Sequence, residues 1–138
     1  MRRSSAPVSW SQSQLLAVHA IDPASTAYNE PLLVWLRGGL VAQPLETALG
    51  VITRRHQVLR TTYEVCSDGG FAQRVHAALA SDVLVEAHAR SDAEASGLAD
   101  SDASSGFVLL DARGCALRAM LVRVCGDGLS RRQLLLLN

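Results

Sequence analysis

The sequence has 138 residues, about one domain, and its 13 basic residues are all arginine and equal its 13 acidic residues in number. Because the net charge is zero, we do not expect a nucleic-acid partner held by phosphate neutralisation. With no apolar run near the length of a membrane span and no signal peptide after the first arginines, we expect a cytoplasmic protein without a membrane partner.

The cysteines are Cys66, Cys115 and Cys125, an odd number without a C-x-x-C spacing. This pattern is neither a disulfide framework nor a zinc site, so we expect no bound metal. We interpret all three as reduced thiols in strands.

The first part of the chain predicts a tail, a helix and a strand. Residues 1–7 are predicted to be a disordered N-terminal tail. Ser9 precedes Gln12 by three positions, the capping-box spacing of a helix start, so a helix is expected near residues 10–20. Residues 32–36 are all apolar and lie between Pro31 and a glycine pair, which predicts a strand buried on both faces.

A second helix is predicted over about residues 43–56. Pro44 suits the first turn of a helix, and the apolar face is expected to comprise Leu45, Leu49, Ile52 and His56. Residues 60–65 then alternate as a half-buried strand does. Residues 67–70 predict a turn, and residues 71–76 a partner strand that completes a hairpin.

The last part of the chain predicts three more strands. They cover residues 83–88, 115–124 and 133–138, while residues 91–106 fit either a loose acidic helix or a loop. In residues 115–124, one face is expected to carry Leu117, Ala119 and Leu121, and the other Met120, Val122 and Val124. Turns are expected at residues 112–114 and 126–128. Four consecutive leucines, 134–137, need a covering layer on each side, so we expect a chain cut from a larger domain. The fold class is α/β (α+β), a mixed sheet with helices packed on it.

The junction at residues 54–63 is the most informative segment, since Arg54, Arg55 and His56 stand where helical spacing changes to strand spacing. Cations at a helix C-terminus complement the helix dipole, which gives the segment a purely structural interpretation. The alternative is a junction that faces a cleft or a partner, because such charges need water or a counter-ion.

Six segments in order resemble the condensation domains of nonribosomal peptide synthetases. The first core motif corresponds to residues 9–15, with Ser9, Gln12, Gln14 and Leu15 at its motif positions. The second core motif is matched at Arg55, His56, Leu59, Arg60 and Thr61. The other matches are Ala27-Tyr28-Asn29-x-Pro31, Leu36-Arg37-Gly38 with Leu45-Glu46-x-Ala48-Leu49, Gly114-x-x-Leu117-Arg118-Ala119, and residues 134–138.

The resemblance implies a chloramphenicol-acetyltransferase-like half domain, with residues 8–138 as a partial condensation domain, its N-terminal subdomain. Three residues depart from the family pattern. Gln14 stands where the family has arginine, Leu16 where it has tryptophan, and Cys115 where it has proline.

The family's catalytic motif, His-His-x-x-x-Asp-Gly, is absent from the sequence, whose histidines are the isolated His19, His56, His76 and His88. The resemblance implies that Arg55 clamps the aspartate of that motif in the family active site. We interpret His56 as a satisfied helix-end residue, and no residue of this chain is assigned a catalytic role.

The resemblance implies partners and a reaction as well. Condensation domains form amide bonds between thioesters on the phosphopantetheine of peptidyl carrier protein domains, and no cofactor is expected on the chain itself. The chain is expected to be an inactive fragment that lacks the C-terminal half of the domain. A noncatalytic module that docks a carrier protein or a second half is the alternative, and a related acyltransferase of the polyketide-associated or wax-ester type is a third possibility.

Overall fold

The computed structural model describes residues 5–78, 83–111, 116–125 and 132–138. The chain divides into two compact units, each built from three separate stretches of sequence. Unit 1 comprises residues 1–25, 51–81 and 106–116, and unit 2 comprises residues 26–50, 82–105 and 117–138.

Unit 1 contains a small antiparallel sheet and a capped helix. The strands β1 (Ser5–Pro7), β4 (Phe71–Val75) and β3 (Thr61–Val65) pair in that order. Helix α1 (Trp10–Ile21) begins at the predicted capping box, in which Ser9 and Gln12 each accept a hydrogen bond from the other's backbone N–H. The prediction of a disordered tail is wrong for residues 5–7, because β4 offers a free edge with which they pair.

The hairpin predicted in unit 1 is confirmed. Strands β3 and β4 pair from Val65 opposite Phe71 to Thr61 opposite Val75. Gly69 adopts a φ of 82°, a left-handed conformation that costs glycine little. The Asp68 carboxylate accepts a hydrogen bond from the Gly70 N–H and closes the turn.

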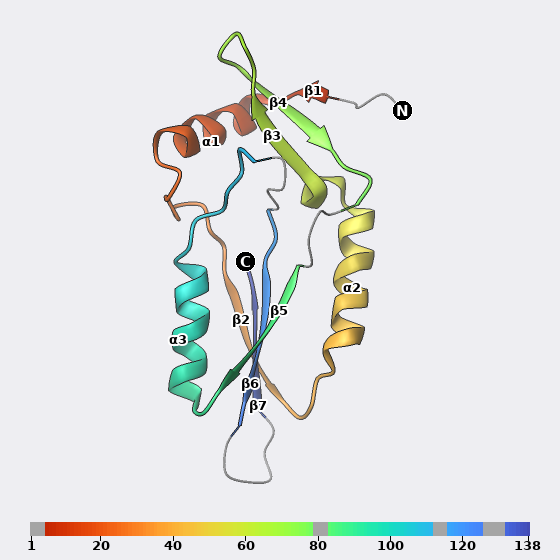
Figure 1. Ribbon diagram of the computed structural model, residues 1–138, viewed down its shortest axis with the longest axis vertical. Helices are drawn as coiled ribbons and strands as arrows, with labels where there is room; N and C mark the ends of the chain where they lie inside the picture. Colours follow the sequence, from red (N-terminus) through yellow and green to blue (C-terminus); the bar gives the residue numbers. More distant parts are fainter. Residues whose placement is uncertain (1–4, 79–82, 112–115, 126–131) are drawn as a thin grey trace. The chain divides into compact units, whose positions relative to one another are not determined.

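Unit 2 is built on a mixed four-stranded sheet in the order β2–β7–β6–β5 (Figure 1). The strands are β2 (Leu32–Arg37), β5 (Leu84–Ala89), β6 (Ala119–Val124) and β7 (Arg132–Leu137). Only β5 and β6 are parallel, and they flank helix α3 (Asp92–Ala103) in sequence. The mixed α/β fold predicted from the sequence is confirmed.

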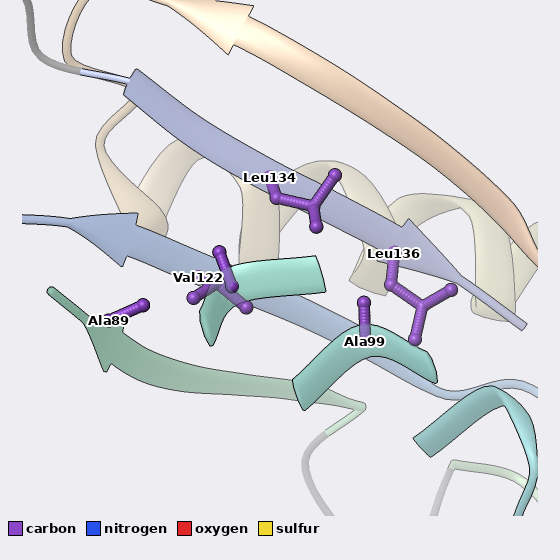
Figure 2. Packing of buried hydrophobic residues seen from close by; sticks show 6 residues of the cluster. Ala89, Ala99, Val122, Leu134 and Leu136 are labelled. Carbon is purple, nitrogen blue, oxygen red and sulfur yellow. The ribbon is translucent and has the colours of Figure 1, made fainter. Parts of the chain in front are cut away.

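Each face of this sheet is covered by one helix of the unit. On one face, Ala95 and Ala99 of α3 pack with Ala89, Val122, Leu134 and Leu136, five of which Figure 2 labels. On the other, Ala42 and Leu49 from the first half of α2 (Ala42–Arg55) pack with Leu84, Ala119 and Leu121. The predicted alternation is therefore confirmed for residues 119–124, while Leu117 lies before the strand, and β7 contributes leucines to both faces.

Two predicted burial patterns are wrong. Strand β2 is not buried on both faces: Leu32, Leu33, Val34 and Trp35 are all exposed, because β2 is an edge strand that the described helices do not cover. In α2 the buried stripe runs through Ala42, Leu45, Leu49 and Thr53, so Ile52 and His56 face solvent.

Residues 91–106, which fitted a helix or a loop, form helix α3 up to Ala103. Its N-cap is Ser91, whose hydroxyl accepts the Glu94 N–H, while the Glu94 carboxylate accepts the Arg90 N–H. These contacts make a capping arrangement at an acidic first turn, which the helix dipole favours. Residues 112–114 and 126–128, where two turns were predicted, lie outside the described residues.

Candidate functional site

The second core motif spans the end of α2, a 3₁₀ turn and the start of β3, within unit 1. Helix α2 ends at Arg55, and the His56 N–H donates to the Ile52 carbonyl 2.9 Å away. His56 has an extended backbone with φ −105° and ψ 102°, which interrupts the helical conformation. The 3₁₀ helix η1 (Gln57–Arg60) begins directly after it. The Thr61 hydroxyl then donates to the Gln57 carbonyl at 2.8 Å and fixes the entry into β3.

Arg60 braces this junction from inside. Its guanidinium donates to the His76 carbonyl and, at 3.5 Å, to the Arg54 carbonyl at the end of α2. The His76 N–H returns a hydrogen bond to the Arg60 carbonyl at 3.0 Å. One side chain thus ties the helix end to the residue that follows β4, and a cation there also suits the negative end of the helix.

His76 extends the bracing, although no pattern in the sequence marked it out. Its Nε2 lies 2.7 Å from the hydroxyl of Thr62, a buried residue of β3. The hairpin register could have identified it, because Val65 opposite Phe71 implies that position 60 faces position 76. The histidine that holds the junction together is therefore His76, whereas the sequence singled out His56.

Arg55 and His56 lie on the outside of the junction, and both are exposed. Among the described residues, Arg55 forms no ion pair and no side-chain hydrogen bond, and the His56 side chain makes no capping bond. His56 is a helix-end residue with a paired backbone and a solvated ring. Within the part of the chain that the structure describes, the junction therefore presents a guanidinium without a partner on a hydrogen-bonded support.

The two core motifs meet through Gln12. Its side-chain amide donates to the Tyr63 hydroxyl on β3 at 3.4 Å, while its carbonyl oxygen completes the α1 capping box. Leu16 of the same helix is 1% exposed, but Gln14 and Leu15 face solvent. The first motif therefore acts locally as a helix cap whose glutamine also contacts the strand leading out of the second motif.

Two further family-matched residues meet in unit 2, at the C-terminus of α3. The Asn29 amide donates to the carbonyls of Ala103 and Ser105 at 2.8 and 2.9 Å. The Arg118 guanidinium donates to the carbonyls of Asp102 and Ser105 at 2.9 and 2.8 Å, with an ion pair to the Asp102 carboxylate at 3.5 Å. The last carbonyls of a helix lack intrahelical partners, so Asn29 and Arg118 cap it.

Within the described ranges, no three histidine, cysteine or carboxylate side chains cluster as a metal site would require. Among the same residues, no helix has the length and hydropathy needed to span a membrane. The described site is a junction that presents the Arg55 guanidinium, a group whose chemistry suits a carboxylate.

Comparison with known proteins gives one consistent family. The family model described as Condensation domain matches residues 2–130. A linear gramicidin synthase of Brevibacillus parabrevis is 35% identical over 128 residues, covering 89% of this chain and 2% of that protein. Chondramide synthase of Chondromyces crocatus is 44% identical over 63 residues, covering 46% of this chain and 2% of the synthase.

Solved structures show the same fold at low identity. The starter condensation domain of rhizomide synthetase superposes with a TM-score of 0.77 at 18% identity, over 96% of this chain and 32% of that one. The first condensation domain of the calcium-dependent antibiotic synthetase gives a TM-score of 0.76 at 17% identity, over 97% and 32%. The chain thus spans about a third of these structures and a small fraction of the synthetases.

Proposed function

Since the chain belongs to the condensation domain family, we propose that it is the N-terminal part of a condensation domain that forms amide bonds in nonribosomal peptide synthesis. The donor and acceptor would be thioesters on the phosphopantetheine arms of peptidyl carrier protein domains. The catalytic His-His-x-x-x-Asp-Gly segment is absent from these 138 residues and would come from the rest of the domain. The chain alone would then be inactive.

The observation that carries this proposal is Arg55, which is exposed on its braced junction and has no ion pair or side-chain hydrogen bond among the described residues. A guanidinium offers parallel N–H donors that match both oxygens of a carboxylate. Arg60, through its bonds to the Arg54 and His76 carbonyls, holds the backbone on either side, so Arg55 needs little reordering to bind. Arg55 would clamp the aspartate of the catalytic segment and thereby fix the orientation of its histidine.

The test uses the longer gene product that contains this chain, loaded donor and acceptor carrier proteins, and mass spectrometry of the carrier-bound product. We expect Arg55→Ala to lower the rate about 10- to 100-fold, the range for a displaced catalytic group. Arg54→Ala is the matched control, since Arg54 is the adjacent exposed arginine and contributes its backbone carbonyl, which the substitution keeps.

Equal rates for Arg55→Ala and Arg54→Ala would overturn the role of Arg55. Amide formation by the 138-residue chain alone would overturn the need for an added catalytic segment. Thermal unfolding of both variants separates a lost clamp from a lost fold.

A second candidate is a noncatalytic module that docks a carrier protein or a complementing half. The exposed apolar residues of β2 favour it, because unpaired edge strands with apolar faces associate readily. Size-exclusion chromatography of the chain checks this candidate, and a clean monomer that ignores added carrier protein and second half counts against it.

A further inference from the structure

A thiol and an imidazole lie together at one end of the unit 2 sheet. Cys125 follows β6, and its N–H donates to the Ala89 carbonyl at 2.8 Å, which continues the ladder between β6 and β5. The Cys125 Sγ lies 3.9 Å from His88 Nδ1, and Cys125 is exposed. The thiol is therefore open to small molecules and close to a possible proton acceptor.

The strand register explains why these two side chains meet. His88 is opposite Arg123 in the parallel pair, and Cys125 lies two residues further along, on the face that carries Glu86 and Arg123. The charged neighbours on this face neutralise each other, since Arg123 donates to the Glu86 carboxylate at 2.8 Å and to the Leu40 carbonyl at 3.0 Å. Among the described residues, His88 is the titratable group within hydrogen-bonding distance of the thiol.

We propose that Cys125 and His88 form a reactive thiol site for low-molecular-weight disulfides. His88 Nδ1 takes the thiol proton, and the thiolate attacks one sulfur of the incoming disulfide. A bond forms between Cys125 Sγ and that sulfur as the incoming S–S bond breaks. The other half leaves as a thiolate, which recovers the proton from His88, so the small disulfide is the oxidant and the reaction balances.

Cys66 provides an internal comparison. It lies in the β3–β4 turn, is partly buried, and its backbone pairs with Gly70 and Gly69. Among the described residues, no histidine nitrogen lies within hydrogen-bonding distance of its sulfur. Since the thiolate is the attacking species, a thiol without a nearby base should react more slowly at neutral pH.

The probe is oxidised glutathione, with the full chain at neutral pH and timed quenching. Trypsin cleaves after arginine and separates the three cysteines into residues 61–74, 114–118 and 124–131, so mass spectrometry follows each thiol independently. We expect Cys125 to form its mixed disulfide about fivefold or more faster than Cys66. In denaturant the two rates should converge.

His88→Gln separates proton transfer from simple exposure. We expect it to slow Cys125 to about the rate of Cys66, while Cys66 itself is unchanged, and circular dichroism checks the fold. If that variant does not fold, His88→Asn, which keeps an acceptor near Nδ1 without accepting a proton at neutral pH, serves instead. Equal native rates for the two cysteines, or a Cys125 rate unaffected by the His88 variants, would overturn the proposal.

Discussion

Strands β2 and β7 pair along their whole length, from Leu32 opposite Leu137 to Arg37 opposite Arg132. Both carry runs of large apolar residues, yet Leu134 and Leu136 of β7 are fully buried, whereas Leu33 and Trp35 opposite them are 40% and 44% exposed. The difference comes from position, because β7 has strands on both sides and helices on both faces. Apolar composition predicts a strand, and its neighbours decide how much of it is buried.

The sharpest test compares two leucines that face each other across this pair. Leu136→Ala removes a fully buried side chain and should lower the free energy of unfolding by about 2–5 kcal/mol. Leu33→Ala deletes the same atoms from the edge strand and should cost below about 1 kcal/mol. Urea unfolding of both variants measures the difference.

A loss of about 2–5 kcal/mol approaches the whole stability of a small domain. If Leu136→Ala shows no folded baseline, the smaller change Leu136→Val should still cost more than Leu33→Val. Equal costs at the two positions would mean that β2 is as well covered as β7, and the contrast between them would fail.

The same contrast shows what the sequence could predict. Six strands and three helices of the described structure were predicted near their observed positions, because period-two and period-3.6 patterns are local. For one of these helices, α3, a loop was the alternative. Burial was predicted less well. The leucines of 134–137 were expected to lack cover, but α3 and α2 cover them, and the exposed run is instead β2.

The candidate site shows a similar limit. The core motif from Arg55 to Thr61 was visible in the sequence, but His76 and Tyr63, which brace it, were not. Their contacts are set by hairpin register and by packing between distant segments, neither of which a local pattern contains. In α2, the predicted apolar stripe ran through Ile52, and only the packed structure identifies Thr53 as the buried residue and Ile52 as an exposed one.

The next test concerns Gln133, a buried polar residue near the start of β7. Gln133 is 3% exposed, accepts the Leu40 N–H at 2.7 Å and donates to the Leu40 carbonyl at 3.1 Å. Gln133→Leu leaves the Leu40 N–H without this partner and should cost about 1–3 kcal/mol in urea unfolding. Gln43→Leu on the exposed side of α2 is the control, and an equal cost there would remove any special role for Gln133.

A smaller effect is expected from loosening the helix that covers one face of β7. Asn29→Ala deletes both bonds to the Ala103 and Ser105 carbonyls and should cost about 1–2 kcal/mol, with faster hydrogen exchange near the end of α3. Glu30→Ala, at the exposed neighbouring position, should leave both unchanged. If exchange in α3 is the same in the two variants, Asn29 does not cap the helix.

The smallest effect concerns the charged end of the strand pair, where Arg132 of β7 lies opposite Arg37 of β2. Arg132 forms a 2.7 Å ion pair with Asp92 at the start of α3, but the two side chains are 51% and 39% exposed. Arg132→Gln should therefore cost about 0–1 kcal/mol, less in high salt. Arg37, which has no ion pair among the described residues, opposes a like charge, so Arg37→Gln should be neutral or slightly stabilising in urea unfolding. A larger loss of unfolding free energy for Arg37→Gln than for Arg132→Gln would contradict this prediction. The greater contribution of β7 to stability would then come from its leucines alone.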